Sequence, residues 1–493
     1  MSRPPRKGPL YLASVSLDEA SSIPLHRQLY FALREAILDG RLRPGARLPS
    51  SRSLASDLRV SRNTVLASFE QLLAEGYIEG RIGAGSFVSE LLPEHALNAR
   101  PGHVDSLPQV VQPPGPSKRG TYLTSMVTGT SRPRAFAPGL PELAAFPFED
   151  WARLLQRHWR NPPESFLIGS DPAGYGPLRE ALARYLGASR AVRCRAEQVF
   201  IVSGAQQALD LAARVLLDPG DEVWVEDPGY PGLIGALLAS GSQLVPLTVD
   251  QEGLSVTEGR HLSPRARMAC ISPSHQYPLG VTMTLARRLE LLEWAREADA
   301  FVLEDDYDSE YRYTGRPLAA LQGLDTDGRV IYVGTMSKVM FPGLRLGYMV
   351  VPEHLVASFK AVRRLTDTHP STLAQPALAE FIEEGSLAAH VRRTRSLYAE
   401  RQQMLLDALG QMPDGLIAAH PSEAGMHLVA SLAAGIDDRK LAVAARRHGV
   451  EAPPLSSYYR AHHPRQGLLL GYAGVPEKLI ERGVAGLARA LSS

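Results

Sequence analysis

Apolar residues recur at helical spacing near the start of the chain. Leu25, Leu29, Leu33 and Ile37 follow one another at intervals of four, so they share one face of a helix that we expect over residues 24–38. A glycine and a proline come after this stretch and should end the helix. The first element that the pattern predicts is therefore an amphipathic helix.

Two more helices and a hairpin are expected before residue 90. The second helix is predicted over Ser51–Leu58, and the third over residues 61–75, where the Ser61 hydroxyl can cap the first turn. Residues 77–88 then read as a small hairpin with a glycine-rich tip. We therefore interpret residues 15–90 as one compact domain of three helices and a hairpin.

Beyond residue 90 the pattern changes twice. Residues 91–130 scatter prolines through polar sequence, which is typical of an extended linker. From residue 131 to 493, short apolar runs alternate with helical segments, so an α/β domain with a mostly parallel sheet is expected. Residues 376–493 are mainly helical and should form a smaller α+β subdomain. The strands expected are Gln198–Ser203, Glu222–Glu226, Met268–Ser272, Ala300–Glu304, Val330–Thr335, Leu346–Val351 and Gly467–Tyr472.

Length and composition agree with this division. A chain of 493 residues is too long for one ordinary core. Its two cysteines, Cys194 and Cys270, cannot build a disulfide framework, and no CxxC or His/Cys cluster predicts a structural metal. The N-terminus lacks the apolar core of a signal peptide, and no apolar run is long enough to span a bilayer. We therefore expect a cytoplasmic protein without a membrane segment.

Positive charge is concentrated in the first domain, although the whole chain has a net charge of only +1. Between Arg41 and Arg62 there are six arginines against one acid, Asp57, a local net charge of +5. Such a stretch fits a nucleic-acid face, and a solvated surface is the alternative that charge alone leaves open.

The start of the third predicted helix carries side chains suited to reading DNA. Three helices and a glycine-tipped hairpin make a winged helix-turn-helix, which places a helix N-terminus in the major groove. Arg62 can grip a guanine or a phosphate, and Asn63 can bind an adenine edge. A helical domain that docks a protein is the alternative. The residues expected to contact DNA are Arg52, Ser61, Arg62, Asn63, Thr64, Arg81 and Gly83.

Three segments of this domain together resemble the GntR family of bacterial regulators. They are Arg47–Ala55, Val60–Val65 and Leu73–Ile78. The resemblance covers the whole domain. It implies binding to a double-stranded DNA operator, usually by a dimer on two half-sites.

Residues 335–347 indicate a different chemistry. Lys338 follows a predicted strand, Thr335 and Ser337 stand beside it, and Arg345 comes seven positions later. The lysine amine can form an imine with an aldehyde, and the hydroxyls and guanidinium can hold a phosphate. This combination predicts a site for pyridoxal phosphate (PLP).

Four other segments at predicted strand ends agree with a PLP site. Residues 203–206 form a small-residue turn into a helix, where backbone N–H groups can cradle phosphate. Asp305 could face the pyridine nitrogen and keep it protonated, and Tyr307 could reach the phenolic oxygen. Tyr230 offers an aromatic face, although it could equally be a packing residue. The loop 274–280 could bring Gln276 or Tyr277 to the ring edge.

Together these segments resemble fold-type I aminotransferases over roughly residues 135–493. The resemblance implies that Lys338 forms the Schiff base with PLP, that Asp305 pairs with the pyridine nitrogen, and that Tyr307 faces the phenolic oxygen. The residues that it assigns to ring stacking and to the phosphate are Tyr230, Arg345, Thr335, Ser337, Ser203, Gly204, Ala205 and Gln206.

A GntR-like domain, a linker and an aminotransferase-like domain resemble the MocR-type subfamily of GntR regulators. The segments Pro273–Gly280 and Glu304–Tyr313 are similar to that subfamily in particular. It implies a multi-domain fold: an α+β winged helix-turn-helix plus an α/β fold-type I transferase domain with a smaller α+β subdomain. It also implies PLP as cofactor, an amino compound or PLP as signal, and a head-to-tail homodimer.

One departure from the aminotransferase pattern bears on function. Amino-acid aminotransferases usually carry a late Arg-Leu-Ser-Phe-Ala strand, whose arginine clamps the substrate carboxylate. Leu469 stands at that position, with Arg465 nearby in the sequence. Because leucine cannot bind a carboxylate, ordinary turnover of α-amino acids is disfavoured. We expect a PLP-dependent transcriptional regulator; an active aminotransferase with a DNA-binding domain and a DNA-binding scaffold with a vestigial cofactor site are the alternatives.

Overall fold

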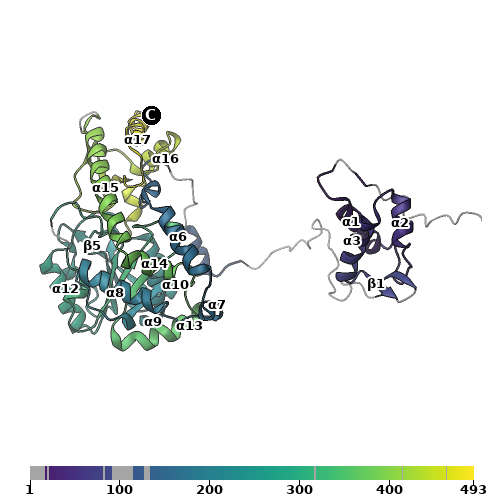
Figure 1. Ribbon diagram of the computed structural model, residues 1–493. Helices are drawn as coiled ribbons and strands as arrows, with labels where there is room; N and C mark the ends of the chain where they lie inside the picture. The colour runs from purple at the N-terminus through teal and green to yellow at the C-terminus, as the bar shows by residue number, and fades with distance from the viewer. Residues whose placement is uncertain are drawn as a thin grey trace, which may run out of the picture. The chain divides into compact units, whose positions relative to one another are not determined.

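The computed structural model contains two compact units, Met1–Pro114 and Gly115–Ser493. We call the described part of the first unit the head and that of the second the body, and each is treated by itself (Figure 1). The residues that the structure describes are 17–18, 21–81, 84–90, 115–126, 134–315, 318–412, 415–461 and 464–492.

The head consists of three helices and a hairpin, as predicted. Leu29, Leu33 and Ile37 are buried on one face of the first helix, which confirms the four-residue spacing argument. The two strands pair antiparallel, with Ile78 opposite Val88. The elements are α1 (Leu25–Leu38), α2 (Ser51–Leu58), α3 (Arg62–Ala74), β1 (Ile78–Arg81) and β2 (Gly85–Val88).

An eight-stranded mixed sheet forms the centre of the body. Its order is β3-β10-β9-β8-β7-β4-β5-β6. The strands from β5 to β9 along this order run parallel, whereas β10 is antiparallel to both of its neighbours and β6 is antiparallel to β5. The strands are β3 (Val199–Val202), β4 (Glu222–Asp227), β5 (Gln243–Asp250), β6 (Gly253–Leu254), β7 (Met268–Ile271), β8 (Phe301–Asp306), β9 (Val330–Thr335) and β10 (Gly347–Val350).

Helices cover both faces of this sheet, because alternate strand residues enter different cores. Val223 and Val225 of β4 pack with α9, α10 and α13, whereas Trp224 between them packs with α11 and α12. This two-sided burial explains the continuous apolar strands of the sequence. The helices of the body are α5 (Lys118–Met126), α6 (Phe148–Trp159), α7 (Glu164–Ile168), α8 (Gly176–Arg190), α9 (Ala205–Leu216), α10 (Pro231–Ser240), α11 (Val256–Leu262), α12 (Leu285–Glu297), α13 (Val356–Thr366), α14 (Gln375–Glu383), α15 (Ser386–Gly410), α16 (Asp438–Arg447) and α17 (Glu477–Leu491).

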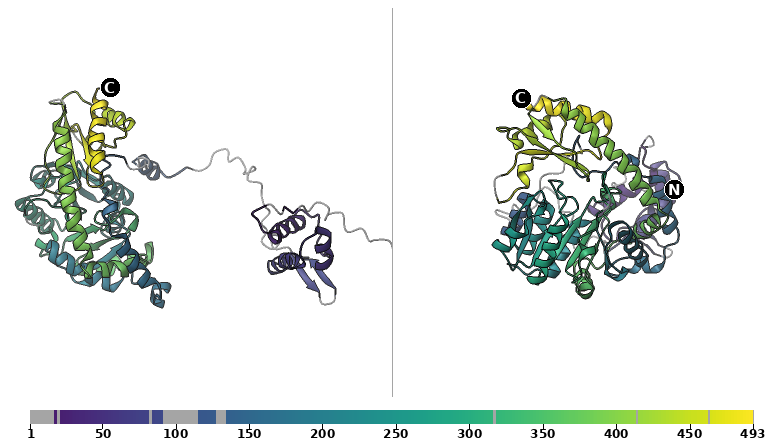
Figure 2. Two further views of the ribbon diagram at one scale, coloured as in Figure 1. Left: turned by 45° about the horizontal axis from the view of Figure 1, so that its top comes forward. Right: turned by 90° about the vertical axis from the view of Figure 1, so that its left-hand side faces the viewer.

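A second, three-stranded antiparallel sheet lies near the C-terminal end of the body. It has the order β11-β12-β13. Helices α15 and α16 pack with this sheet, and α17 packs against both of these helices (Figure 2). Helix α14 packs against α8 and α6 instead, although it falls inside the stretch expected to form the small subdomain. The strands are β11 (Ile417–Ala419), β12 (His427–Leu432) and β13 (Gly467–Gly471).

One part of the expected linker is helical. Residues 118–126 form α5, which packs on α10 and so belongs to the body, whereas the composition had suggested an extended chain. Most of the remaining linker stretch, 91–114 and 127–130, lies outside the described residues. Among the helices that the structure describes, none is long and apolar enough to cross a membrane.

The packing of the sheet just before Lys338 can be tested at Gly334 of β9. A Cβ at Gly334 would lie 2.4 Å from the Tyr348 ring, so Gly334→Ala should destabilise the body by about 1–3 kcal/mol. Gly235→Ala in α10 is the control; a Cβ there meets nothing within 4 Å, and the change should stabilise by roughly 0.5–1 kcal/mol. Urea unfolding followed by tryptophan fluorescence reports the body alone, since all four tryptophans lie in it. Equal midpoints for the two variants would contradict this packing.

Candidate functional site

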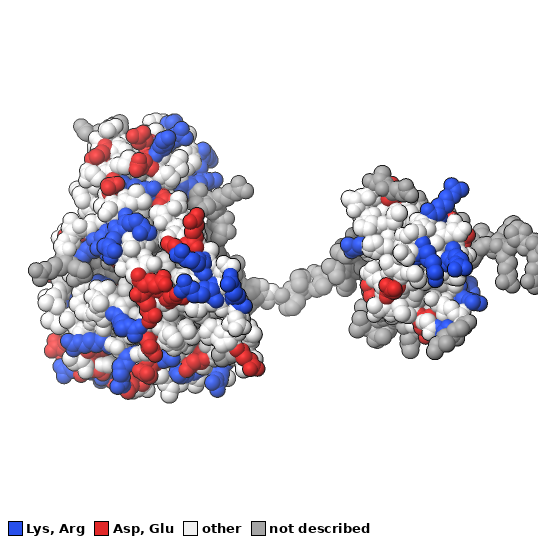
Figure 3. All heavy atoms as spheres, in the orientation of Figure 1, with Lys and Arg blue, Asp and Glu red and all other residues white. Residues whose placement is uncertain are grey.

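Helix α3 of the head begins as the sequence predicted. The Ser61 hydroxyl accepts a hydrogen bond from the Thr64 N–H at 3.1 Å and caps α3. Arg62 and Asn63, the first two residues of the helix, are exposed. Arg52 is also exposed, in the first turn of α2. Basic side chains gather on one side of the head (Figure 3). This surface suits DNA phosphates and base edges.

The wing is only partly described. Arg81 ends β1, donates hydrogen bonds to Glu79 and stands 4.7 Å from the centre of the Phe87 ring. The hydrogen bond and charge of Glu79 raise the pKa of Arg81. Arg81 is thus held by neighbours in the absence of DNA, and Gly83 lies outside the described residues.

In the body, a cavity of about 350 Å³ lies at the carboxyl ends of the strands. This is where open α/β sheets place ligands. Most of the predicted cofactor residues line it, whereas Ser203 and Gln276 do not. The residues lining the cavity are Pro138, Gly139, Gly204, Ala205, Gln206, Tyr230, Tyr277, Asp305, Tyr307, Asp308, Thr335, Ser337, Lys338, Pro342, Arg345, Met426 and His427.

Lys338 projects into this cavity from the turn that follows β9. Its Nζ donates a hydrogen bond to the Gly139 carbonyl at 2.8 Å. Burial lowers the pKa of Lys338, while the charges of Asp308 and Asp305 act in the opposite direction. A lowered pKa increases the neutral fraction of the amine, which is the form that attacks an aldehyde.

Asp305, the penultimate residue of β8, has an unsatisfied carboxyl group. Its Oδ1 is buried and has no hydrogen-bond partner. Burial, together with the charges of Asp306 and Asp308, raises the pKa of Asp305 to about 7. A buried carboxyl without a partner is costly, so the site lacks a group that can donate to it. A protonated pyridine nitrogen is such a donor.

One end of the cavity is built for an anion. Gly204 caps α9 with φ +104°, and a Cβ there would lie 3.5 Å from the Arg345 guanidinium. The N-terminal residues of α9, Ala205 and Gln206, therefore border the cavity beside a cation. Thr335 and Ser337 line the same cavity, and the Thr335 hydroxyl accepts a hydrogen bond from the Ser337 N–H at 3.1 Å. Backbone N–H groups at a helix N-terminus and an arginine together suit a phosphate.

Three tyrosines form an aromatic wall. The rings of Tyr230 and Tyr277 meet edge to face at 5.7 Å, and those of Tyr277 and Tyr307 at 6.0 Å. Of the two side chains expected at the ring edge, Tyr277 lines the cavity. The buried amide of Gln276 instead donates to the Pro228 carbonyl at 2.8 Å, so Gln276 acts in loop structure. The expectation for Gln276 is corrected because its hydrogen-bonding capacity is used within the protein.

The sequence reasoning missed a buried group behind Tyr307. His275 Nδ1 lies 2.9 Å from the Tyr307 hydroxyl and 3.0 Å from Asp308 Oδ2. His427, from β12 of the small sheet, completes the group and lines the cavity. Burial and the nearby His275 lower the pKa of His427 to about 3, so its ring is neutral. His275 and Asp308 lie in the segments Pro273–Gly280 and Glu304–Tyr313, but nothing in the sequence linked these segments to His427.

Leu469, which the sequence pattern aligns with the arginine of aminotransferases, belongs to β13. In the small sheet, Val429 of β12 pairs with Leu469 and His427 with Gly471. Directly paired residues and residues two apart share a face of a sheet, so Leu469 is on the same face as His427. Leu469 is fully buried. Arg465 is exposed and lines a neighbouring cavity that shares His427, so it does not replace the arginine in this one.

The raised pKa of Asp305 predicts a pH dependence for the cofactor-free protein. The folded carboxyl binds its proton more tightly than the unfolded one, so the folded state holds more protons between about pH 4 and 7 and its stability falls as pH rises through that range. In the wild type this fall in the free energy of unfolding should be on the order of 2–4 kcal/mol, and Asp305→Asn should abolish it. The pH dependence is measured from urea unfolding midpoints at several pH values, with tryptophan fluorescence as the signal. Glu149→Gln, which changes an exposed carboxyl, is the control. Identical pH profiles for wild type and Asp305→Asn would contradict the assignment.

Comparison with known proteins assigns both units to families. Residues 25–88 match the family of bacterial regulatory proteins called gntR, and residues 140–487 match aminotransferase class I and II. The kynurenine aminotransferase of Pyrococcus horikoshii, solved in complex with PMP, is 31% identical, with a TM-score of 0.68 over 79% of this chain and 98% of that one. This fold family implies a PLP-binding domain.

Relatives with both units match nearly the whole chain. The probable rhizopine catabolism regulatory protein MocR of Rhizobium meliloti is 45% identical over 96% of this chain and 95% of the relative. The pyridoxine biosynthesis regulator PdxR of Corynebacterium glutamicum is 30% identical over 96% of this chain and 97% of its own. The chain therefore belongs to the MocR-type GntR transcriptional regulators, in which a helix-turn-helix domain is joined to an aminotransferase-like domain.

Proposed function

We propose that the body holds PLP, senses an amino compound or PLP itself, and thereby controls how the head binds its operator in the cytoplasm. The observation that carries this proposal is the cavity in which Lys338, the unpartnered Asp305 carboxyl and the anion cradle around Arg345 converge. These residues fit PLP: they offer an amine for its aldehyde, an acceptor for its pyridinium and cations for its phosphate.

When bound, PLP supplies an aldehyde that reacts reversibly with amines. Lys338 would hold it covalently, and an amino ligand would compete with Lys338 for the same carbon. Release of the lysine leaves an amine that must find another partner, and the Gly139 carbonyl already lies 2.8 Å from Nζ. Because Gly139 lies between α5 and α6 and Lys338 follows β9, the ligand state can alter how these segments pack. A ligand that favours one arrangement shifts the population towards it.

The absence of a clamping arginine supports sensing over turnover. Apart from Lys338 and Arg345, no lysine or arginine of the described residues lines the cavity. Productive transamination requires the substrate to be held in a fixed orientation, which the missing clamp would otherwise provide. An active aminotransferase remains the second candidate, since the lysine and aspartate that serve that chemistry are present. Release of a keto acid when amines are screened would favour it.

The covalent lysine gives the first test of regulation. Lys338→Ala should abolish the change in operator affinity on adding PLP or an amino ligand, an effect we expect to be about 5–150-fold in the wild type. Operator fragments can be selected from genomic DNA with the full chain, and affinity measured by fluorescence anisotropy. Lys360→Ala, which alters a lysine bound to Asp171 instead, should behave as wild type. Affinity that responds equally in Lys338→Ala would refute the proposal.

The head gives an independent test. Arg62→Ala should weaken operator binding by about 1–3 kcal/mol if Arg62 contacts a base, and Arg52→Ala should reduce the salt dependence by about one unit if Arg52 contacts a phosphate. Arg27→Ala is the matched control. Arg27 lies beside Phe31 on α1, away from the two helices that carry Arg52 and Arg62. Anisotropy titrations at several salt concentrations separate the two effects. Unchanged binding in both recognition variants would place the DNA-binding surface elsewhere on the head.

A further inference from the structure

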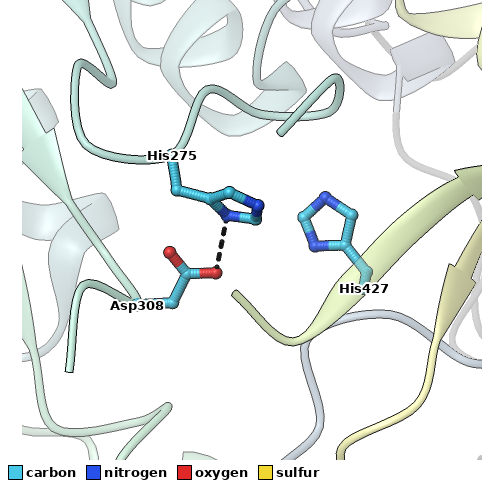
Figure 4. A group of neighbouring side chains, drawn as sticks. All are labelled: His275, Asp308 and His427. Atoms are coloured by element: carbon cyan, nitrogen blue, oxygen red, sulfur yellow. Dashed lines mark hydrogen bonds and ion pairs between the residues drawn. The ribbon is translucent and has the colours of Figure 1, made fainter. Parts of the chain in front are cut away.

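Three buried side chains from different parts of the body meet beside the cofactor cavity. His275 comes from the loop after β7, Asp308 follows β8, and His427 belongs to β12. One ligand atom from each lies within 4.8 Å of the other two. Figure 4 shows the His427 ring facing the bonded pair of His275 and Asp308. No other buried group of this composition occurs in the described part of the chain.

His427 is oriented as a metal ligand would be. Its Nε2 donates a hydrogen bond to the Pro278 carbonyl at 3.1 Å, which fixes the tautomer and leaves a lone pair on Nδ1. Nδ1 makes no hydrogen bond within the described residues. A histidine that donates one ring N–H to a backbone carbonyl and presents the other nitrogen is the usual arrangement of metal-ligating imidazoles.

His275 can present its Nδ1 to the same ion. This nitrogen lies 3.0 Å from Asp308 Oδ2, so a cation at this point would be held by both atoms. The ring proton would then stand on Nε2, which lies 3.5 Å from the Ser422 hydroxyl oxygen. Gly425, with φ +93°, encloses the ring, since a Cβ there would lie 2.0 Å from His275 Cε1. The backbone thus makes room for this imidazole.

Asp308 supplies the negative charge. Its side chain is 1% exposed, and its Oδ1 is buried without a hydrogen-bond partner. A buried anion with an unsatisfied oxygen is costly unless a cation or donor is provided. The Lys338 charge reaches Asp308, but no hydrogen bond joins the two within the described residues.

We infer that His275, Asp308 and His427 bind a divalent transition-metal ion, Zn²⁺ being the best fit to two imidazoles and one carboxylate. Zinc at about 2.0–2.1 Å from each ligand needs ligand atoms about 3.3 Å apart. The present atoms lie within 4.8 Å of one another, so loading would draw them together by at most about 1.5 Å. The ion would bridge the large sheet and the small sheet, because His427 alone of the three comes from the latter.

A bound ion would also supply a positive charge in place of the clamping arginine. His427 shares a sheet face with Leu469, which stands where an arginine would clamp a carboxylate. With three protein ligands, zinc keeps a coordination position for an outside group, and Asp308 and His427 both line the cavity. The ligand class is then an amino compound that carries a carboxylate or another metal-binding oxygen. This last step rests on the proposed sensing function, whereas metal binding itself does not.

Zinc titration of the full chain tests the inference. The protein is stripped with chelator and titrated with Zn²⁺ by calorimetry, both with PLP bound and as PLP-free Lys338→Ala, so that chelation by PLP itself is recognised. One Zn²⁺ per chain is expected in both. His427→Gln and Asp308→Asn should each weaken binding by more than about 100-fold, since even outer partners of metal ligands are worth 10–100-fold. The control is His420→Gln, which changes an exposed imidazole of the same subdomain and should leave the affinity unchanged.

The outcomes separate the metal site from the sensing function. Zinc binding that is absent, or equally strong in the wild type, His427→Gln and Asp308→Asn, overturns the metal site. Asp308→Asn preserves size and shape, so retention of its PLP absorbance and unfolding midpoint shows that a loss of zinc is not a loss of fold. Zinc bound as expected, with operator affinity unaffected by any amino ligand, would support the site and contradict the proposed function instead.

Discussion

The body is organised around a carboxyl group that the protein buries and leaves without a hydrogen-bond partner. Asp305 is the penultimate residue of β8, near the point where five parallel strands present their carboxyl ends, and its Oδ1 has no donor within the described residues. Such a group lowers stability unless a ligand supplies a proton donor. Lys338 and the Arg345 cradle line the same cavity and offer partners for an aldehyde and a phosphate.

This constraint links fold to function through burial. The parallel strands are apolar on both faces, so polar chemistry can gather only at their ends. The residues that hold a cofactor therefore come from separate loops, and each depends on the packing of its own strand. Burial lowers the pKa of Lys338 and raises that of Asp305, so both groups are held ready for a partner that arrives from outside. A site with these properties can report the presence of a ligand as readily as it can turn one over.

Much of the fold and part of the site could be predicted from the sequence. The spacing of Leu29, Leu33 and Ile37 and the cap at Ser61 located the head, because helix periodicity and capping are local properties. Lys338, Asp305 and Tyr307 line the cavity, and the sequence could bring them together because each lies at or just beyond the end of an apolar strand. Gln276 was misplaced because sequence cannot tell a side chain that faces a cavity from one that closes its own loop. His427 was missed because its strand joins the site only through the packing of the small sheet.

The central claim is that the bond between Lys338 and PLP is the switch through which an amino ligand reaches the operator. Borohydride reduction makes that bond irreversible without changing any residue of the chain. The most direct measurement is therefore the operator affinity of the PLP-loaded protein, with and without an amino ligand, before and after reduction. We predict that the ligand shifts the affinity before reduction and has no effect after it. An equal response in the reduced protein would contradict the account.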